Sequence, residues 1–391
     1  MQYEEGAREV SGMRVGVMDT ALVARPAVDS LTRANYLAAV ANRVDSFWVP
    51  DHLNALFPRS IWAPKYCGAA RLIPMADASL EPWTVLGHLA ARNRVGRLRL
   101  GVSVTDTGRR NPAVTAQAAA TLHLLSRGRA ILGFGTGERE GNEPYGVDWS
   151  KPVARFEEAL AKIRALWNSN GELVKRDSPF FPLRGAVFDL PPYRGKWPEI
   201  SGSPLMVHGC CGPPGDTAMP GFPRSPTGPK TTGNVWKLSG PRPPTQDATR
   251  WPILPAVEFL VVTGPSRGAV DDALNSPVLK TLSLTASDEV FARHGARHPL
   301  GEGFSGSQDL VPHAFDERTA LSHAAQVPSP VMREVFLTGT PDEVVDQAAQ
   351  WRDRGARYIV VADVSSLQRS LRGGLAAIMP FARILRGLKK L

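Results

Sequence analysis

Four short apolar segments in the first 170 residues alternate with longer helix-forming segments. Strands are expected at 14–19, 46–49, 98–104 and 130–134, and helices at 30–44, 83–91, 112–125 and 152–167. Alternation in this order is typical of parallel strands joined by crossover helices. The sequence therefore predicts an α/β protein. A (β/α)8 barrel is favoured, and a doubly wound open sheet is the alternative.

The length of 391 residues suits two or three domains or one large α/β barrel with insertions, and a single barrel domain covering residues 1–391 is favoured. Apolar residues make up 43% of the chain and charged residues 21%, an ordinary balance for a globular protein. Three cysteines exclude a disulfide framework and favour the cytoplasm. The acidic start of the chain does not resemble a signal peptide, and no apolar run is long enough to span a membrane.

The formal net charge of +9 indicates anionic partners. A phosphate, a polyanionic cofactor, an anionic lipid surface and a nucleic acid all fit this sign. The arginines are scattered, which argues against nucleic acid, because a nucleic-acid face needs clustered charge. The end of the chain, residues 386–390, is basic, and a solvated helix end explains it equally well.

Two features are expected in the rest of the chain. Residues 171–199 are rich in aromatic residues and prolines, and are interpreted as an ordered insertion, a hairpin with a loop. The insertion would form either an apolar wall for a substrate or a cover for the barrel. Near the C-terminus, Thr340, Pro341 and Glu343 have the spacing of a capping box at the start of a helix. A strand at 358–361 and a last helix follow.

Residues 201–250 do not fit the pattern. This window holds 8 Gly and 10 Pro in 50 positions, and no helical or strand period survives in it. A structureless stretch of this length is unusual inside a compact domain. Three interpretations remain open: a flexible insertion, a proline-rich docking segment, or a stretch translated out of frame between two compensating frameshifts.

The first candidate for catalysis is the strand end at residues 48–52. In a parallel barrel the active face is formed by the carboxyl ends of the strands. His52 beside Asp51 at such an end can give or take a proton near neutral pH. A surface turn capped by Asp51 is the alternative.

The second candidate is the glycine-rich strand end at residues 133–138. Its G-x-G-x-G spacing is not that of a dinucleotide loop, and the acidic residues Glu138, Glu140 and Glu143 would repel a pyrophosphate. Gly135, Thr136 and Gly137 would instead let a flat ring approach the backbone, with Glu138 as an acid or a hydrogen-bond acceptor. A plain tight turn is the alternative.

The third candidate is the segment from Ser103 to Asp106, which continues to Arg109, Arg110 and Asn111. Its arginines precede a helix N-terminus, where an anion is favourable. A solvated charged loop is the alternative.

No metal site is expected. His208, Cys210 and Cys211 are poorly spaced for a tetrahedral site, and no second cluster accompanies them. His294 and His298 lie at i, i+4 but lack a glutamate partner motif, and are expected to be solvated.

Taken together, these strand ends resemble the luciferase-like family of flavin and deazaflavin enzymes. The matching segments are residues 48–52, 111–117, 133–138 and 339–343, and the similarity covers roughly 13–200 and 251–391. The resemblance implies a TIM barrel, the deazaflavin coenzyme F420 and reduction of the keto group of a long-chain lipid, with a homo-oligomer and peripheral membrane contact as further expectations. An FMN-dependent monooxygenase and an inactive relic are the rivals.

By position within this family, His52 and Glu138 match the catalytic pair, and Asp51 matches an acid near the coenzyme ring. Ser103 and Val104 match a bulge with a non-prolyl cis peptide that supports the ring. Members of the family usually carry a helix and a Gly-Arg-Tyr-Ala-Asp segment after the strand near Ile200. Residues 201–250 lack them, so the resemblance implies a barrel that is incomplete there.

Overall fold

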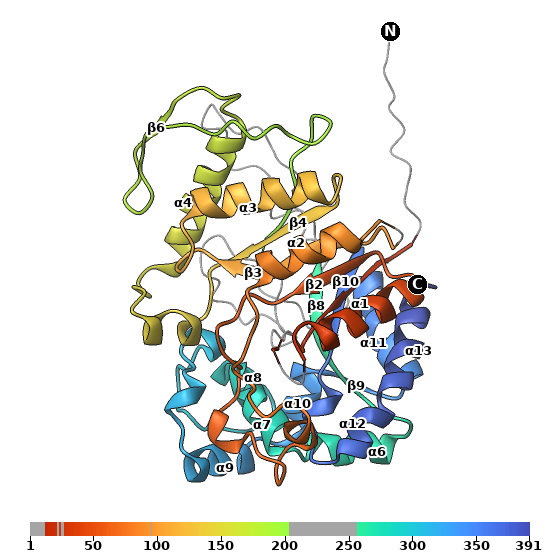
Figure 1. Cartoon of the computed structure of the whole chain (residues 1–391). Coiled ribbons are helices and arrows are strands. Elements are labelled where there is room, and N and C mark those ends of the chain that lie inside the picture. The colour runs from red at the N-terminus through yellow and green to blue at the C-terminus, as the bar shows by residue number, and fades with distance from the viewer. Residues whose placement is uncertain (1–11, 22, 25–26, 95, 203–255) are drawn as a thin grey trace.

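Eight strands in the described part of the computed structural model form one parallel sheet (Figure 1). The structure describes residues 12–21, 23–24, 27–94, 96–202 and 256–391. The strand order is β7-β4-β3-β2-β1-β10-β8-β9. The bounds are Arg14–Met18 (β1), Ser46–Val49 (β2), Arg99–Asp106 (β3), Ala130–Gly135 (β4), Glu199–Gly202 (β7), Val257–Thr263 (β8), Leu337–Gly339 (β9) and Tyr358–Asp363 (β10).

Helices follow the strands along the chain, as the alternation predicts. Their bounds are Ser30–Ala41 (α1), Pro82–Arg92 (α2), Pro112–Leu125 (α3), Pro152–Trp167 (α4), Arg267–Leu274 (α6), Pro277–Leu282 (α7), Asp288–Arg293 (α8), Glu317–Ala325 (α9), Ser329–Val335 (α10), Pro341–Asp353 (α11), Leu371–Ala376 (α12) and Ile378–Leu388 (α13). The four strands and four helices predicted before residue 170 are confirmed. The last helix is divided in two at Ala377, and no element had been predicted between residues 264 and 336.

The first and last strands are neighbours, which is the arrangement a barrel requires. β1 pairs with β10 on one side, with Val15 opposite Ile359, and with β2 on the other. β7 and β9 end the described sheet. The chain between β7 and β8, residues 203–255, lies outside the described residues. The predicted incompleteness of the barrel and the three interpretations of 201–250 fall almost entirely there.

Both faces of the sheet are buried, so most side chains of its strands are apolar. Phe47 and Val361 point to the cluster between the sheet and its helices. Trp48 and Val360 point to a second cluster on the opposite face. Gly101 is required beside Trp48, because a Cβ there would lie 2.4 Å from the indole ring.

The insertion at residues 171–199 is a hairpin, as predicted, formed by β5 (Val174–Arg176) and β6 (Leu183–Ala186). It leaves the end of α4 and leads into the start of β7, so it lies at the amino ends of the strands, opposite the strand ends that His52 and Glu138 follow. Figure 1 shows β6 beside α4. Trp197 stacks on Trp167 of α4 at 5.4 Å. This position favours the interpretation of the insertion as a cover over that of a substrate wall.

Side chains cap the starts of two helices discussed above, and one of these caps is the predicted capping box of Thr340 and Glu343. Asn111 accepts a hydrogen bond from the backbone N–H of Ala113 at the start of α3. The capping box of α11 is formed, with the backbone N–H of Thr340 donating to Glu343 over 2.9 Å. Over the described ranges, no helix has the length and apolar character needed to cross a bilayer.

Candidate active site

The carboxyl ends of β2, β3 and β4 meet on one side of the sheet, and the predicted site residues follow them. Asp51 and His52 come directly after β2, and Asp106 at the end of β3 lies opposite Gly135 at the end of β4. Glu138 follows three residues later. Parallel pairing of adjacent strands thus brings His52 and Glu138 together, although 86 positions separate them in the chain.

His52 lies beside two carboxylates. Its Nδ1 atom is 3.1 Å from Oε1 of Glu140 and 3.7 Å from Oε2 of Glu138. The exposed fractions of the side chains are 25% for His52, 16% for Glu138 and 2% for Glu140. Glu140 therefore supports the imidazole from within the protein, and Glu138 faces more open space.

Sequence reasoning missed the part played by Glu140, which it weighed only as a charge that repels phosphate. A signal was present, because Glu138 and Glu140 are spaced i, i+2 after the end of a buried strand. The short helix at Arg139–Gly141 turns the second carboxylate back toward His52.

The two carboxylates hold the imidazole in its charged form. Burial opposes the charge, but the hydrogen bond to Glu140 and the negative charges of Glu138 and Glu140 raise the pKa of His52 to about 9. Burial raises the pKa of Glu138 to about 7, although the positive His52 opposes this rise. At neutral pH the site therefore holds an imidazolium beside a carboxyl group close to its midpoint.

The same three side chains have the donor types of a cation site, and their ligand atoms lie within 4.8 Å of one another. A histidine must be neutral to bind a metal ion. With the pKa of His52 near 9, this ring is protonated at neutral pH. The donor set therefore suits proton transfer better than metal binding.

The carboxylate of Asp51 is hydrogen-bonded to neighbouring side chains. It accepts a hydrogen bond from Thr105 Oγ1 at 2.6 Å and one from Arg110 Nε at 3.0 Å. Arg109 pairs with Asp106 at 2.7 Å and lies 3.4 Å from Asp51. Burial opposes the negative charge of Asp51, but the guanidinium groups of Arg109 and Arg110 hold the pKa of Asp51 below its ordinary value. These contacts join β2 to β3 beneath His52.

The peptide bond between Ser103 and Val104 is cis, as the resemblance implies. It lies at an irregularity of β3, between the points where Val102 and Thr105 pair with β4. The hydroxyl of Ser103 donates to the carboxylate of Glu258 on β8 over 2.6 Å.

Glu258 is a second residue that sequence reasoning missed. It is 6% exposed, and burial raises its pKa to about 7, with His52 and Glu138 close enough to influence its charge. A carboxylate inside an apolar strand, between Val257 and Phe259, was the available signal.

The glycine-rich segment after β4 presents mainly backbone to the site. Gly137 has φ of +84°, and a Cβ there would lie 2.6 Å from Cβ of Asp106. The hydroxyl of Thr136 donates to the carbonyl of Gly137 at 3.3 Å, and Gln308 donates to the same carbonyl at 3.2 Å. Gly135 is the last residue of β4.

The two histidines at i, i+4 do not form a site together. His294 pairs with Glu334 at 2.6 Å. His298 is buried between Phe291 and Phe304, and burial lowers its pKa to about 4. The expectation that His298 is solvated was wrong, because its ring packs in the core. His208, Cys210 and Cys211 lie outside the described residues.

The parallel sheet and the acid–base cluster at its carboxyl end define the class of protein. The chain belongs to the luciferase-like monooxygenase family, whose model matches residues 13–215. Within that family it belongs with the relatives named phthiodiolone/phenolphthiodiolone dimycocerosates ketoreductase. The relative from Mycobacterium sp. (strain JLS) is 64% identical over 387 residues, covering 98% of this chain and 100% of its own. The relative from Mycobacterium tuberculosis (strain ATCC 25618 / H37Rv) is 53% identical over 388 residues, with the same coverage.

The solved structures agree on the fold. An F420-dependent secondary alcohol dehydrogenase in complex with an F420-acetone adduct superposes with a TM-score of 0.62 at 16% identity. The match covers 95% of this chain and 99% of that one. The expected luciferase-like TIM-barrel fold is confirmed.

Proposed function

We propose that this protein is an F420-dependent ketoreductase. It would reduce the keto group of phthiodiolone and phenolphthiodiolone dimycocerosates to phthiotriol-type alcohols, in the synthesis of phthiocerol dimycocerosate and phenolic glycolipids of the cell envelope. The observation that carries this proposal is the pairing of His52 with Glu138 and Glu140 at the carboxyl end of the sheet, in a chain 64% identical to a named ketoreductase. The cytoplasm is the compartment we infer.

The residues present fit a flat, hydrogen-bonding coenzyme ring. Oε2 of Glu138 is buried, yet no donor among the described residues lies within hydrogen-bonding distance of it. An unpaired buried acceptor is costly, so a ligand that brings an N–H or O–H group is favoured there. The bulge at Ser103 and Val104 and the backbone of Gly135, Thr136 and Gly137 would hold the ring.

Coenzyme F420, when bound in its reduced form, supplies a hydride to the ketone carbon. The ketone oxygen then needs a proton to become the hydroxyl of the alcohol. His52 holds that proton, because its pKa near 9 keeps the ring charged at neutral pH. Nδ1 of His52 is committed to Glu140, so Nε2 is the nitrogen that would donate to the oxygen.

Glu138 and Glu140 divide the remaining work. Glu140 is nearly fully buried and fixes the orientation and charge of His52. Glu138, with a pKa near 7, is able to exchange a proton with water between turnovers. In this assignment His52 and Glu138 are the catalytic residues, and Glu140 is a positioning residue.

The test is turnover by the purified full chain with reduced F420 and phthiodiolone dimycocerosate, followed by absorbance of the coenzyme. We expect His52→Asn to lower kcat by about 100-fold or more, since a general acid contributes about 10²–10⁴. Binding of F420, measured by fluorescence, is expected to persist in this variant. His88→Asn is the matched control, because His88 is an exposed histidine paired with Asp29.

The rival activities give different outcomes. Binding of FMN without F420, or oxidation of the ketone in the presence of oxygen, would favour a flavin monooxygenase and overturn the proposal. Full turnover by the His52→Asn variant would remove His52 from the mechanism while leaving the reductase activity in place.

A further inference from the structure

The last part of the chain carries basic side chains and no acidic ones. After Asp363 there are six Lys or Arg residues and no Asp or Glu. These are Arg369, Arg372, Arg383, Arg386, Lys389 and Lys390. They lie on α12, on α13 and beside them. A charge of one sign on adjacent helices creates a positive surface potential.

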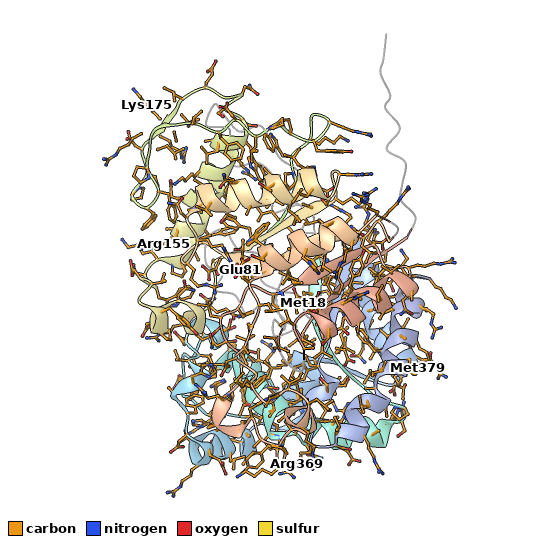
Figure 2. The ribbon with its side chains drawn as sticks, viewed as in Figure 1. Met18, Glu81, Arg155, Lys175, Arg369 and Met379 are labelled. Atoms are coloured by element: carbon orange, nitrogen blue, oxygen red, sulfur yellow. The ribbon has the colours of Figure 1, made fainter. Side chains whose placement is uncertain are left out.

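Large apolar side chains are exposed in the same region. Leu375, Ile378 and Met379 are 52%, 57% and 62% exposed, and they lie within five residues of one another where α12 meets α13. Figure 2 shows Met379 at the margin of the molecule, with Arg369 also at its periphery. We call this the α12–α13 surface, made of these three apolar residues and the six basic residues.

The outward face of α13 continues from the apolar residues into the basic ones. Ile384, Leu385 and Leu388 are buried on the inner side of the helix, which packs beside α11. Met379, Arg383, Arg386 and Lys390 are exposed and follow one another at spacings of four, three and four residues, so they share one helical face.

Most of these charges have no acidic partner. Lys389 pairs with Asp45 at 2.8 Å. In the part of the chain that the structure describes, no carboxylate lies within ion-pair distance of the guanidinium groups of Arg369, Arg372, Arg383 or Arg386. On the neighbouring α11, Glu343 pairs with Arg267 and Asp353 with Arg352, while the exposed Asp342 and Asp346 form no ion pair with the described residues. The positive field of the surface is therefore only partly offset by acids nearby.

The α12 part of the surface lies at the end of the barrel that carries His52, whereas Lys389, just after α13, pairs with Asp45 beside the amino end of β2. β10 ends at Asp363, and α12 begins eight residues later, at the carboxyl ends of the strands. The segment after His52 reaches the same place, since the backbone N–H of Gly68 donates to the carbonyl of Gln368 at 2.9 Å.

The charge of the surface favours an anionic partner over a second copy of this chain. In a two-fold dimer built on this surface, the same patch would face itself, and six basic residues would meet six others. An anionic partner removes this repulsion. A bilayer surface is bound by exposed apolar side chains that lie beside Lys and Arg. The apolar side chains enter the interface, and the basic side chains contact anionic headgroups.

We propose that the α12–α13 surface docks the protein on an anionic lipid bilayer. Leu375, Ile378 and Met379 enter the interfacial layer, and the arginines contact lipid phosphates. Docking in this orientation lays the side of the barrel that carries α13 on the bilayer, with α12 at the His52 end. The proposal stands on charge and exposure and does not depend on the proposed function.

The test is flotation of the purified full chain with vesicles of phosphatidylcholine, with and without phosphatidylglycerol. Binding is expected only with phosphatidylglycerol, and it is expected to weaken as salt is raised. The double variant Arg383→Gln, Arg386→Gln is expected to lower the partition coefficient roughly 30-fold, because each basic residue near such a surface contributes a factor of about 5.

Ile378→Glu is a second variant that tests the apolar part, and Val187→Glu is its matched control. Both side chains are 57% exposed, but Val187 belongs to the insertion at the other end of the barrel. We expect Ile378→Glu to lose vesicle binding and Val187→Glu to keep it, with melting temperatures used to confirm that both variants fold.

Three outcomes would overturn the proposal: no binding to either vesicle, equal binding to both, or equal loss in the two glutamate variants. A dimer that Ile378→Glu dissociates, seen by light scattering without any vesicle binding, would assign the surface to a second copy of the chain.

Discussion

Glu140, five residues after the end of β4, helps to keep His52 positively charged. Glu140 accepts a hydrogen bond from Nδ1 and helps to raise the pKa of His52 to about 9. We expect Glu140→Gln to lower that pKa by about two units, because the negative charge that stabilises the imidazolium is removed. At about pH 8 this lowers kcat/KM about tenfold, whereas at about pH 6 both proteins remain protonated and differ little.

The measurement is the pH profile of kcat/KM for ketone reduction. Glu143→Gln is the control, because Glu143 is an exposed acid of the same loop that pairs with Arg139. An alkaline limb that stays near pH 9 in Glu140→Gln would show that Glu140 does not control the protonation of His52.

A second residue-scale prediction concerns Glu258. Its pKa in the native state is about 7, above the ordinary value of 4.5. Between these two pH values the unfolded chain has released a proton that the native protein retains, so native stability falls as pH rises. Glu258→Gln removes the titration. We expect its free energy of unfolding, relative to the parent, to increase by up to about 3 kcal/mol from about pH 4.5 to about pH 7.

Urea unfolding at about pH 5 and about pH 8 measures this difference. Glu289→Gln serves as the control, since Glu289 is exposed on α8. A stability difference between Glu258→Gln and the parent that is the same at both pH values would contradict the assignment of a raised pKa to Glu258.

The sequence predicted part of this site at the residue scale. His52 and Glu138 were found because they follow strand ends, and parallel strands bring such ends together. Glu140 and Glu258 were not found. The contact of Glu140 depends on how a short helix turns its side chain, and that of Glu258 depends on Ser103, 155 positions away. A local sequence pattern does not show which side chains from distant parts of the chain come into contact.

At the scale of elements, capping chemistry was predictable because it is local. Thr340 and Glu343 lie three residues apart and close the capping box of α11. We expect Thr340→Ala to lower the free energy of unfolding by about 1 kcal/mol, since the backbone N–H groups of the first turn lose a partner. Urea denaturation measures the change.

The control substitution has the opposite expected sign. Thr121 is exposed inside α3, where alanine is the better helix former, so Thr121→Ala is expected to stabilise slightly. A similar loss in both variants would mean that the effect at Thr340 does not come from the cap.

The insertion at 171–199 shows what composition alone leaves open. Its hairpin was expected and its aromatic composition was noted, but composition does not say which end of a barrel a segment covers. The connectivity does, because a crossover helix returns the chain to the amino ends of the strands. The ring centroids of Tyr193 and His123 are 6.1 Å apart, and His123 lies near the end of α3, shortly before β4 begins. This contact confirms that the insertion lies at the amino ends of the strands.

At the scale of the whole molecule, the alternation of strands and helices predicted parallel strands with crossover helices, and the sheet has them. β9 did not follow from that alternation, because this strand is only three residues long and pairs with β8, more than 70 positions earlier. Residues 203–255 lie outside the described residues, so the three interpretations of residues 201–250 remain hypotheses.

We propose an experiment on that window. Residues 201–250 are replaced by the corresponding residues of the Mycobacterium sp. (strain JLS) relative, which matches 98% of this chain. If the window was translated out of frame, the replaced chain is expected to melt cooperatively at a higher temperature and to bind F420 more tightly. Calorimetry and fluorescence measure both.

An outcome in which both chains melt alike and bind the coenzyme alike would show that the window is a tolerated insertion. A rise in melting temperature without any turnover would separate repair of the fold from the proposed function.

The pairing of β1 with β10 has a consequence during synthesis. The ribosome releases β10 roughly 340 residues after β1. Until then one edge of β1 has no neighbour, and its apolar residues need protection from other nascent chains. A chain that stops before β10 would therefore leave β1 unpaired on that edge, far away in sequence from the break.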